Sequence, residues 1–343
     1  MKTVAAILVE QKKPLVIDEV EVPAVKRGQV LVEIHATRVC GSQIGEIDGV
    51  KGPDKYLPHL LGHEAGATVM EIGSGVTHVK VGDRVVCHWR PGAGIDAGGS
   101  VYAWKGKRVN AGPITTFQKY SVISENRLTK VPPDTDFELC CLLADTLTTG
   151  FGIIRNDAKV KEGESVVIFG VGGIGLGVVL GAKLAKANPI IGVDLHDHKL
   201  AKASEYGLTH KINGSKENAS ERIREILGGP ADVVIDGTGN PKVIEAAYDL
   251  TKLRGGRCIL FGVMPHDQRI SIHTLPLHFG RILAGSEGGQ SRPGEDIPQI
   301  LGELSFNHTD WAGFVSDRCT VAELNIKTGK MRSGEIVHLI ATT

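Results

Sequence analysis

Several features are scarce or missing in this chain, and each absence excludes a class of protein. The 39 basic residues equal the 39 acidic residues, so no excess charge favours a polyanion. Aromatic residues make up only 5% of the sequence, which argues against a surface that stacks bases. We therefore expect no nucleic-acid partner.

Long apolar runs and paired cysteines are absent as well. No run approaches the ~20 apolar residues that a membrane span needs. The first residues alternate like a strand and reach charges early, unlike a signal peptide. The six cysteines are scattered, with no Cys-x-x-Cys pair, which indicates free thiols rather than a disulfide framework. These absences predict a cytoplasmic protein without membrane contact.

Glycine, in contrast, is abundant, with 44 residues in a chain of 343. Only 15 prolines and no low-complexity tract accompany it, so the composition indicates tight turns in a compact α/β fold rather than disorder. The length is sufficient for two domains.

The apolar pattern changes near residue 137. Before that point, alternation with period two predicts strands, for example over 29–41. The glycine-rich residues 88–116 are predicted as a long loop or lobe. After a helical run at 136–154, short continuous apolar runs alternate with helical segments, which is typical of a parallel sheet covered on both faces.

The strongest local motif is VVIFGVGGIGLG. Gly170, Gly172 and Gly175 form G-x-G-x-x-G directly after an apolar strand and at the start of a helix, with Gly173 and Ile174 between them. Glycines there permit a tight turn and close approach of a pyrophosphate, which the helix N-terminus binds through backbone N–H groups. The alternative is a glycine-rich turn in an unrelated α/β domain.

Asp194 ends the next predicted strand, about 20 residues beyond the glycines, where a carboxylate grips the adenosine ribose hydroxyls. It would also repel a 2′-phosphate, and no arginine follows it, so NAD is favoured over NADP. The neighbouring His196, His198 and Lys199 leave NADP open. The alternative for Asp194 is a residue that merely ends a strand.

Several motifs recur in a fixed order along the chain. Cys40 lies just past a predicted strand in RVCGSQ, and His63 and Glu64 lie in LGHEAGATVMEIGSGV. Three more follow: VGDRV at 81–85, TTGFG at 148–152 and MRSGE at 331–335. Over essentially its whole length, the sequence resembles the zinc-dependent alcohol dehydrogenases of the medium-chain dehydrogenase/reductase family.

The resemblance implies a fold and an assembly. Residues 1–150 and 286–343 would form a GroES-like, β-rich catalytic domain. Residues 151–285 would form a Rossmann dinucleotide-binding domain with a doubly wound parallel sheet. A homodimer or homotetramer is implied as well.

The resemblance also implies that Cys40 and His63 bind one catalytic zinc, with Glu64 as an outer or exchanging ligand. Thiolate and imidazole suit Zn²⁺, and a catalytic site keeps one position open. For His63 alone, the alternative is a hydrogen-bonded buried histidine. Ser42 matches the family's hydroxyl residue that relays the alcohol proton, and an ordinary turn serine is its alternative.

The third metal ligand departs from the family pattern. A cysteine usually lies three residues before the TTG-like turn, and this chain has Asp145 there. We predict that Asp145 binds zinc. The alternative makes Asp145 an outer acid or a substrate acceptor, with Glu64 as the third ligand. Cys140 and Cys141 lie too early and are predicted to fill apolar core.

Other matches and departures concern the cofactor, the lobe and the proton. Thr149 of the TTG motif and Arg332 of the MRSGE motif would contact the cofactor, and a solvated surface arginine is the alternative for Arg332. The lobe has only Cys87 in place of the four cysteines that hold a second zinc in many relatives, so we predict one metal per chain. Gly45 and Glu46 stand where many relatives have a histidine that carries the proton outward, so the proton would leave by another route, through water, the cofactor ribose or an unidentified group.

Together these observations predict an oxidoreductase that transfers a hydride between NAD and a secondary alcohol or polyol, such as a sugar or cyclitol derivative. The polyol suggestion depends on a set of polar residues near the predicted pocket: Gln43, Glu46, Asp48, Trp89 and Arg90. A zinc-free alkene reductase of the same scaffold and a non-catalytic nucleotide-sensing protein are the alternatives.

Overall fold

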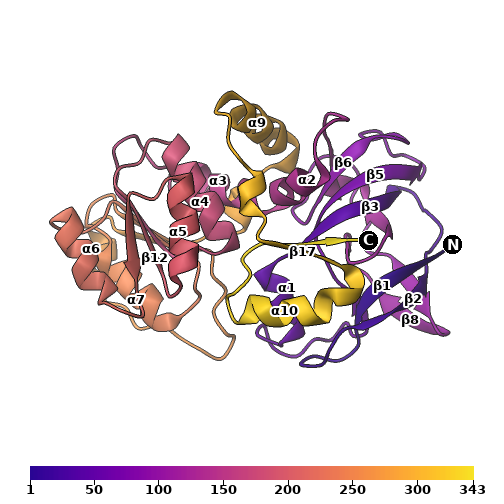
Figure 1. Ribbon diagram of the computed structural model, residues 1–343, viewed down its shortest axis with the longest axis horizontal. Coiled ribbons are helices and arrows are strands. Elements are labelled where there is room, and N and C mark those ends of the chain that lie inside the picture. The colour runs from indigo at the N-terminus through magenta and orange to yellow at the C-terminus, as the bar shows by residue number, and fades with distance from the viewer. The chain divides into compact units, whose positions relative to one another are not determined.

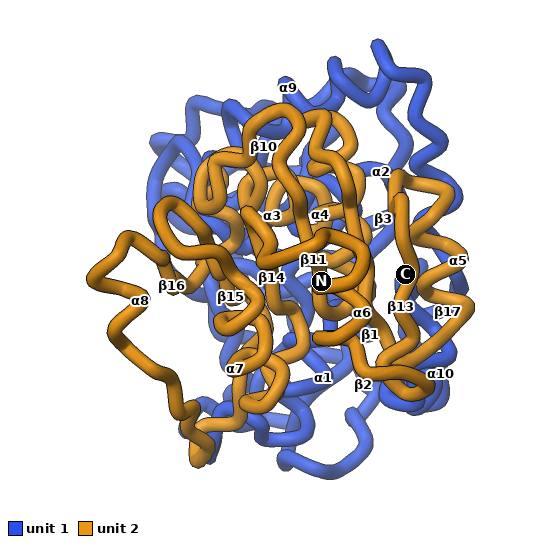
Figure 2. Tube along the Cα trace, turned by 90° about the vertical axis from the view of Figure 1, so that its left-hand side faces the viewer, with its two compact units in different colours: residues 1–145, 292–343 blue, residues 146–291 orange.

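The computed structural model describes residues 1–343, which divide into two compact units. Unit 1 comprises Met1–Asp145 and Arg292–Thr343, and unit 2 comprises Thr146–Ser291 (Figure 2). These divisions lie a few residues from the domain limits that the sequence suggests. Both ends of the chain lie in unit 1 (Figure 1).

Unit 1 is rich in β-structure. Its strands are β1 (Lys2–Leu8), β2 (Val16–Glu21), β3 (Gln29–Val39), β4 (His59–Leu60), β5 (Glu64–Ile72), β6 (Arg84–His88), β7 (Val101–Trp104), β8 (Lys107–Asn110), β9 (Tyr120–Ser124), β10 (Leu128–Lys130), β17 (Asp317–Thr320) and β18 (Leu339–Thr342). Its helices are α1 (Gly41–Ile47), α2 (Phe137–Ala144), α9 (Pro293–Phe306) and α10 (Leu324–Arg332).

The strands of unit 1 form a closed barrel and a separate sheet. The barrel order is β1-β2-β7-β8-β4, and the sheet order is β10-β6-β5-β3-β18-β17, with β9 also paired to β3. Apolar residues that alternate along β3 and β5, such as Val30, Val32, Ile34, Ala67 and Val69, enter one core cluster. The period-two pattern therefore sets which faces are buried.

The lobe is more ordered than a loop. The strands β7 and β8 form an antiparallel hairpin within residues 88–116, so the segment predicted as a long loop or lobe contains regular structure. The buried carboxylate of Glu125 accepts hydrogen bonds from the backbone N–H groups of Thr77, His78 and Ile95, at 2.6, 2.9 and 2.8 Å. Burial would raise the pKa of Glu125, but these N–H groups outweigh burial and lower it.

Unit 2 contains the predicted parallel sheet. Its strands are β11 (Val166–Phe169), β12 (Ile190–Asp194), β13 (His210–Asn213), β14 (Val233–Asp236), β15 (Arg257–Leu260) and β16 (Ile282–Gly285), in the order β13-β12-β11-β14-β15-β16. All of their pairings are parallel. The helices are α3 (Thr146–Gly152), α4 (Gly173–Leu184), α5 (Asp197–Tyr206), α6 (Ala219–Leu227), α7 (Pro241–Leu250) and α8 (Leu275–His278).

One helical stretch corrects the expectation that no apolar segment reaches membrane-spanning length. By length and composition, Phe137–Asp157 could cross a membrane, with a mean hydropathy of 1.5 over its most apolar window. That window is 89% buried inside the structure, as in a core helix. The stretch includes Cys140 and Cys141, both fully buried as predicted. All six cysteines are free thiols.

Candidate metal centre and nucleotide-binding turn

Four side chains that can bind a metal ion converge in unit 1. They are those of Cys40, His63, Glu64 and Asp145, and one ligand atom of each lies within 4.8 Å of the others. Three are buried, whereas the side chain of His63 is 20% exposed. The structure thus brings together every residue that the sequence suggests as a metal ligand.

The topology of unit 1 explains this convergence. Cys40 directly follows β3 and begins α1, while His63 directly precedes β5, whose first residue is Glu64. Because β3 and β5 are antiparallel neighbours, the end of the first strand lies beside the start of the second. Asp145 follows α2, which packs on both strands.

The glycine before the histidine is required by the backbone. Gly62 has a φ of +93°, in the region that disfavours side chains. A Cβ atom there would lie 2.3 Å from Thr116 Oγ1 and 2.8 Å from the backbone nitrogen of Phe117. Gly62 therefore lets the chain turn tightly and present His63 to the other ligands.

Gln43 fixes the orientation of the His63 ring. Its side-chain carbonyl accepts from the backbone N–H of Cys40 at 2.9 Å, so its amide nitrogen faces His63 Nδ1 at 2.6 Å. The other ring nitrogen, Nε2, lies 3.3 Å from Glu64 Oε1. Nε2 is therefore the ring nitrogen of His63 that lies beside Glu64.

Glu64 is neutralised by a buried arginine. Arg38 Nη1 donates to both carboxylate oxygens of Glu64 at 2.6 and 2.8 Å, and Arg38 Nε donates to His338 Nδ1 at 2.9 Å. The side chains of Arg38 and Glu64 are 2% and 0% exposed. Burial alone would lower the pKa of Arg38, but Glu64 outweighs it and raises that pKa. No motif signals this pair, because β3 contains other polar residues and Arg38 does not stand out among them.

The carboxylate of Asp145 has a different environment. Its Oδ1 accepts from the indole N–H of Trp89 at 3.0 Å, and its Oδ2 lies 3.7 Å from Cys40 Sγ. The sequence places Trp89 near a pocket but gives no sign of this hydrogen bond.

The donor set fits a zinc ion. Burial favours neutral His63, but hydrogen bonds with Cys40 and Glu64 outweigh burial and raise the pKa of His63 to about 10, so the cluster attracts positive charge. A thiol, an imidazole and a carboxylate are the ligand types that zinc prefers, and imidazole is the commonest metal ligand in proteins. The residues present therefore match the metal that the sequence implies.

Residues around the predicted proton route lie on α1. Ser42 Oγ is buried and has no hydrogen-bond partner. Glu46, one turn further on the same helix, lies 3.9 Å from His59 Nε2, and that nitrogen lies 2.7 Å from Asp54 Oδ2. An imidazole is thus present near the end of α1, although it comes from β4 and not from the position occupied by Gly45.

In unit 2, the glycine-rich motif joins β11 to α4. A Cβ atom on Gly175 would lie 2.1 Å from the carbonyl oxygen of Gly170, so only glycine permits this close approach. Gly172 precedes the helix and offers no side chain to cap it, while Gly173 and Ile174 form its first turn. The first backbone N–H groups of α4 are therefore available to an anion.

Asp194 ends β12 next to this turn. Its two oxygens accept from the backbone N–H groups of Val171 and His196, each at 3.1 Å. The carboxylate is thereby fixed between the glycine-rich turn and the start of α5. Lys199 lies on α5 and is partly exposed, and Thr149 is buried in α3.

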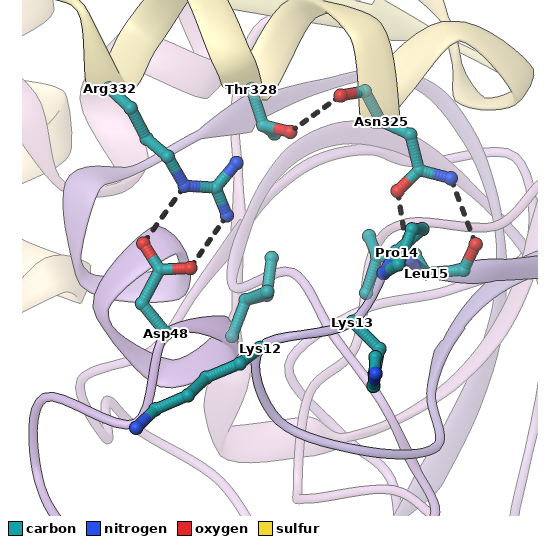
Figure 3. Close-up of a pocket in the computed structure, with 9 residues that line it drawn as sticks. Lys12, Lys13, Pro14, Leu15, Asp48, Asn325, Thr328 and Arg332 are labelled. Carbon is teal, nitrogen blue, oxygen red and sulfur yellow. Dashed lines mark hydrogen bonds and ion pairs between the residues drawn. The ribbon is translucent and has the colours of Figure 1, made fainter.

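Arg332 is held by another residue of unit 1. It lies at the end of α10 and donates through Nε and Nη2 to the two oxygens of Asp48, at 2.9 and 2.8 Å (Figure 3). This pair lies at a shallow pocket that also includes Lys12 and Lys13 and contains none of the four metal-site residues. Arg332 is therefore paired with Asp48 and is not an unpaired surface residue.

The polar residues behind the polyol suggestion have other partners. Gln43 bonds Cys40 and His63, Asp48 pairs with Arg332, and Trp89 bonds Asp145. These three side chains thus form hydrogen bonds within the protein. Their presence therefore no longer favours a polyol over another alcohol as the substrate.

Comparisons with known proteins agree with this geometry. Residues 26–133 match the model of the alcohol dehydrogenase GroES-like domain, and residues 173–305 match that of the zinc-binding dehydrogenases. The chain is 32% identical to S-(hydroxymethyl)glutathione dehydrogenase of Paracoccus denitrificans and 33% identical to alcohol dehydrogenase class-3 of Cereibacter sphaeroides, with 99% of each chain covered.

Solved structures show the same fold. An alcohol dehydrogenase zinc-binding domain protein from Burkholderia ambifaria has a TM-score of 0.90 at 26% identity, covering 100% of this chain and 99% of that one. Benzyl alcohol dehydrogenase from Acinetobacter calcoaceticus has a TM-score of 0.89 at 25% identity, with the same coverage. The predicted pairing of a GroES-like domain with a Rossmann sheet is confirmed. The chain therefore belongs to the zinc-dependent alcohol dehydrogenases of the medium-chain dehydrogenase/reductase family.

Proposed function

We propose that this alcohol dehydrogenase holds a single zinc ion through Cys40, His63 and Asp145 and prefers NAD as the hydride acceptor. The observation that carries the proposal is the convergence of these ligand atoms with Glu64 within 4.8 Å. Zinc bound there would polarise the alcohol oxygen and lower the pKa of its hydroxyl. The fourth position stays open for the substrate.

Charge balance supports Glu64 as an outer residue. Its carboxylate is already neutralised by the bidentate contact with Arg38. The thiolate of Cys40 and the carboxylate of Asp145 carry two negative charges, which match a divalent cation. Removing Arg38 from Glu64 would leave a buried carboxylate unpaired, which is unfavourable.

Ser42 is proposed to receive the alcohol proton. Its hydroxyl is buried, lacks a protein partner and lies two residues beyond Cys40, so it can hydrogen bond to a substrate oxygen. The proton would then pass outward along α1, where Glu46 lies near the imidazole of His59. In this route, Glu46 and His59 take the role of the relay histidine, which the glycine at position 45 cannot provide.

The NAD preference depends on Asp194. Its carboxylate is fixed beside the glycine-rich turn, where it can accept hydrogen bonds from ribose hydroxyls and repel a 2′-phosphate. Lys199 would lie near the adenosine end, and Thr149 near the nicotinamide end. Arg332 would reach the phosphates only after release from Asp48.

We propose a cytoplasmic homodimer as the assembled form, and the free edge of the parallel sheet supports this. The strand β16 pairs only with β15, so its other edge is unpaired. Apolar side chains near this edge are exposed: Leu275 by 51%, Phe279 by 51% and Ile282 by 47%. An unpaired edge with apolar side chains favours association with a second copy.

The function is tested by following NADH formation with primary, secondary and polyhydroxy alcohols, before and after zinc is removed with a chelator. We expect NADH from at least one simple alcohol, loss of the rate on chelation, and recovery when zinc is restored. Turnover of an activated alkene by the zinc-free protein, or zinc binding without any oxidation, would contradict the proposal.

A further inference from the structure

We infer that Trp89 is a positioning residue that holds Asp145 so that a single carboxylate oxygen is offered to the metal. The inference rests on the proposed role of Asp145 as a ligand. The two oxygens of this carboxylate have separate partners: Oδ1 accepts from Trp89 Nε1 at 3.0 Å, and Oδ2 lies 3.7 Å from Cys40 Sγ. The hydrogen bond occupies one oxygen and directs the other toward the thiol.

Asp145 lies just outside a helix, so helical geometry does not set the direction of its side chain. It follows the last residue of α2, with φ of −150° and ψ of −56°, outside the helical region. Trp89 comes from a different element, directly after β6, and β6 packs against α2. The tryptophan is itself fixed, because its carbonyl accepts from Arg127 and the guanidinium of Arg90 lies 5.6 Å from its ring centre.

The chemistry of the donor matters as much as its position. An indole N–H donates a hydrogen bond but carries no charge and cannot bind a metal. The carboxylate of Glu64, in contrast, meets the charged guanidinium of Arg38. The two carboxylates of the cluster therefore meet different donors, a neutral indole at Asp145 and a charged guanidinium at Glu64.

A single coordinating oxygen has a consequence for the coordination number. A carboxylate with one oxygen in a hydrogen bond is biased toward binding through the other oxygen alone. A bidentate carboxylate would fill a further position at the metal, where catalytic zinc sites need room for a substrate oxygen. Partners of metal ligands typically contribute 10–100-fold to metal affinity.

The test compares Trp89→Phe with Trp104→Phe. The control is matched, because Trp104 Nε1 donates to Asp18 Oδ2 at 2.9 Å in the barrel strand β7. Each variant loses one indole–carboxylate hydrogen bond and keeps an aromatic ring. The readouts are the dissociation constant for zinc by chelator competition and the visible absorption of the protein loaded with Co²⁺, which reports coordination number.

We expect Trp89→Phe to bind zinc ~10–100-fold more weakly and to show an altered Co²⁺ spectrum, while Trp104→Phe matches the wild type in both. A folded Trp89→Phe protein with wild-type zinc affinity and spectrum would overturn the inference. Failure of the proposed ligand set is seen separately, since Asp145→Ala would then keep its zinc.

A second measurement avoids any dependence on the folding of Trp89→Phe. In the variant Trp104→Phe with Trp311→Phe, Trp89 is the remaining tryptophan. Its emission should change during a zinc titration, with the same midpoint as zinc binding measured by the chelator. Emission that stays constant while zinc binds would overturn the inference.

Discussion

At the scale of single residues, the metal cluster depends on which donors surround each acid. Asp145→Ala should release zinc and abolish activity together, with a loss of affinity beyond the ~10–100-fold typical of outer partners. Asp145→Cys should recover zinc affinity, because it restores an anionic ligand of a type that zinc binds well. Zinc content by elemental analysis, alongside NADH formation, checks both variants.

Glu64→Gln provides the matched control for Asp145→Ala. It removes a carboxylate from the same cluster, but one that Arg38 already neutralises. We expect it to retain zinc, although the unpaired buried arginine should destabilise the fold. An Asp145→Ala protein with full zinc occupancy would show that Asp145 is not a ligand.

We expect Asp194 to determine the choice between NAD and NADP. Asp194→Ala should raise the KM for NAD by roughly 10–150-fold, since a ribose hydrogen bond to a charged group contributes about 1.5–3 kcal/mol. The KM for NADP should fall, because the repulsion of the 2′-phosphate is lost. Steady-state kinetics with both cofactors measures the change, and a wild-type enzyme that already prefers NADP would refute this reading.

Spacing and motifs are enough to predict the candidate ligands, but not the residues that orient them. Cys40, His63 and Asp145 lie at recognisable places in ordered motifs. Arg38 and His338 are 300 positions apart in sequence, and only the antiparallel pairing of β3 with β18 brings them together. Such contacts follow from tertiary structure, so no local pattern reveals them.

At the scale of elements, strand β6 contains a buried histidine that should make stability depend on pH. Burial is the main cause that lowers the pKa of His88 to about 4, although its hydrogen bond to the carbonyl of Arg90 opposes this. Between pH 6.5 and 4, the unfolded chain therefore binds a proton that the folded chain excludes. The free energy of unfolding should fall by about 3 kcal/mol as the pH decreases across this range.

Urea unfolding of the zinc-free protein at several pH values would measure this effect. Because other groups also titrate, the informative quantity is the difference between wild type and His88→Gln. That difference should shrink as the pH falls from 6.5 toward 4 and stay constant above 7. A difference independent of pH would contradict the assignment to His88.

Strands made of continuous apolar residues can be predicted from the sequence, whereas strands with a mixed polar and apolar pattern cannot. The strands β11, β12 and β14 are fully or almost fully buried, β15 is buried at its two central residues, and the sequence predicts each of them. The hairpin β7–β8 lies in a polar, glycine-rich segment, and β16 is half-exposed, so neither shows a clear period. Their pairing partners, rather than their own residues, determine that they are strands.

At the scale of the whole molecule, the lobe determines how many metal ions a chain holds. Cys87 is the only cysteine between Cys40 and Cys140, and it is fully buried with a pKa raised well above its usual range, so the lobe has no set of thiols that could hold a second zinc. We therefore expect elemental analysis to find one zinc per chain. Two tightly bound zinc ions per chain would contradict this expectation.

The assembly should depend on the free edge of the parallel sheet. Phe279→Glu places a charge next to β16 and should shift sedimentation from a dimer to a monomer. Ile326→Glu is the matched control, because Ile326 is 71% exposed on α10 in unit 1 and should leave the mass unchanged. A Phe279→Glu protein that remains a dimer would place the interface elsewhere.

The carboxylate of Glu125 has a consequence for the survival of this protein when zinc is scarce. Glu125 ties the lobe to the segment between β5 and β6, because it accepts from the backbone N–H of Ile95 in the lobe and from those of Thr77 and His78 outside it. This link uses neither a metal ion nor a thiol. Because the pKa of Glu125 is lowered in the folded state, this support is complete near neutrality and is lost only as the pH falls through that lowered value. Loss of zinc would thus abolish alcohol oxidation while the contacts of Glu125 in the lobe persist. Activity would return when zinc is restored, without refolding of the lobe.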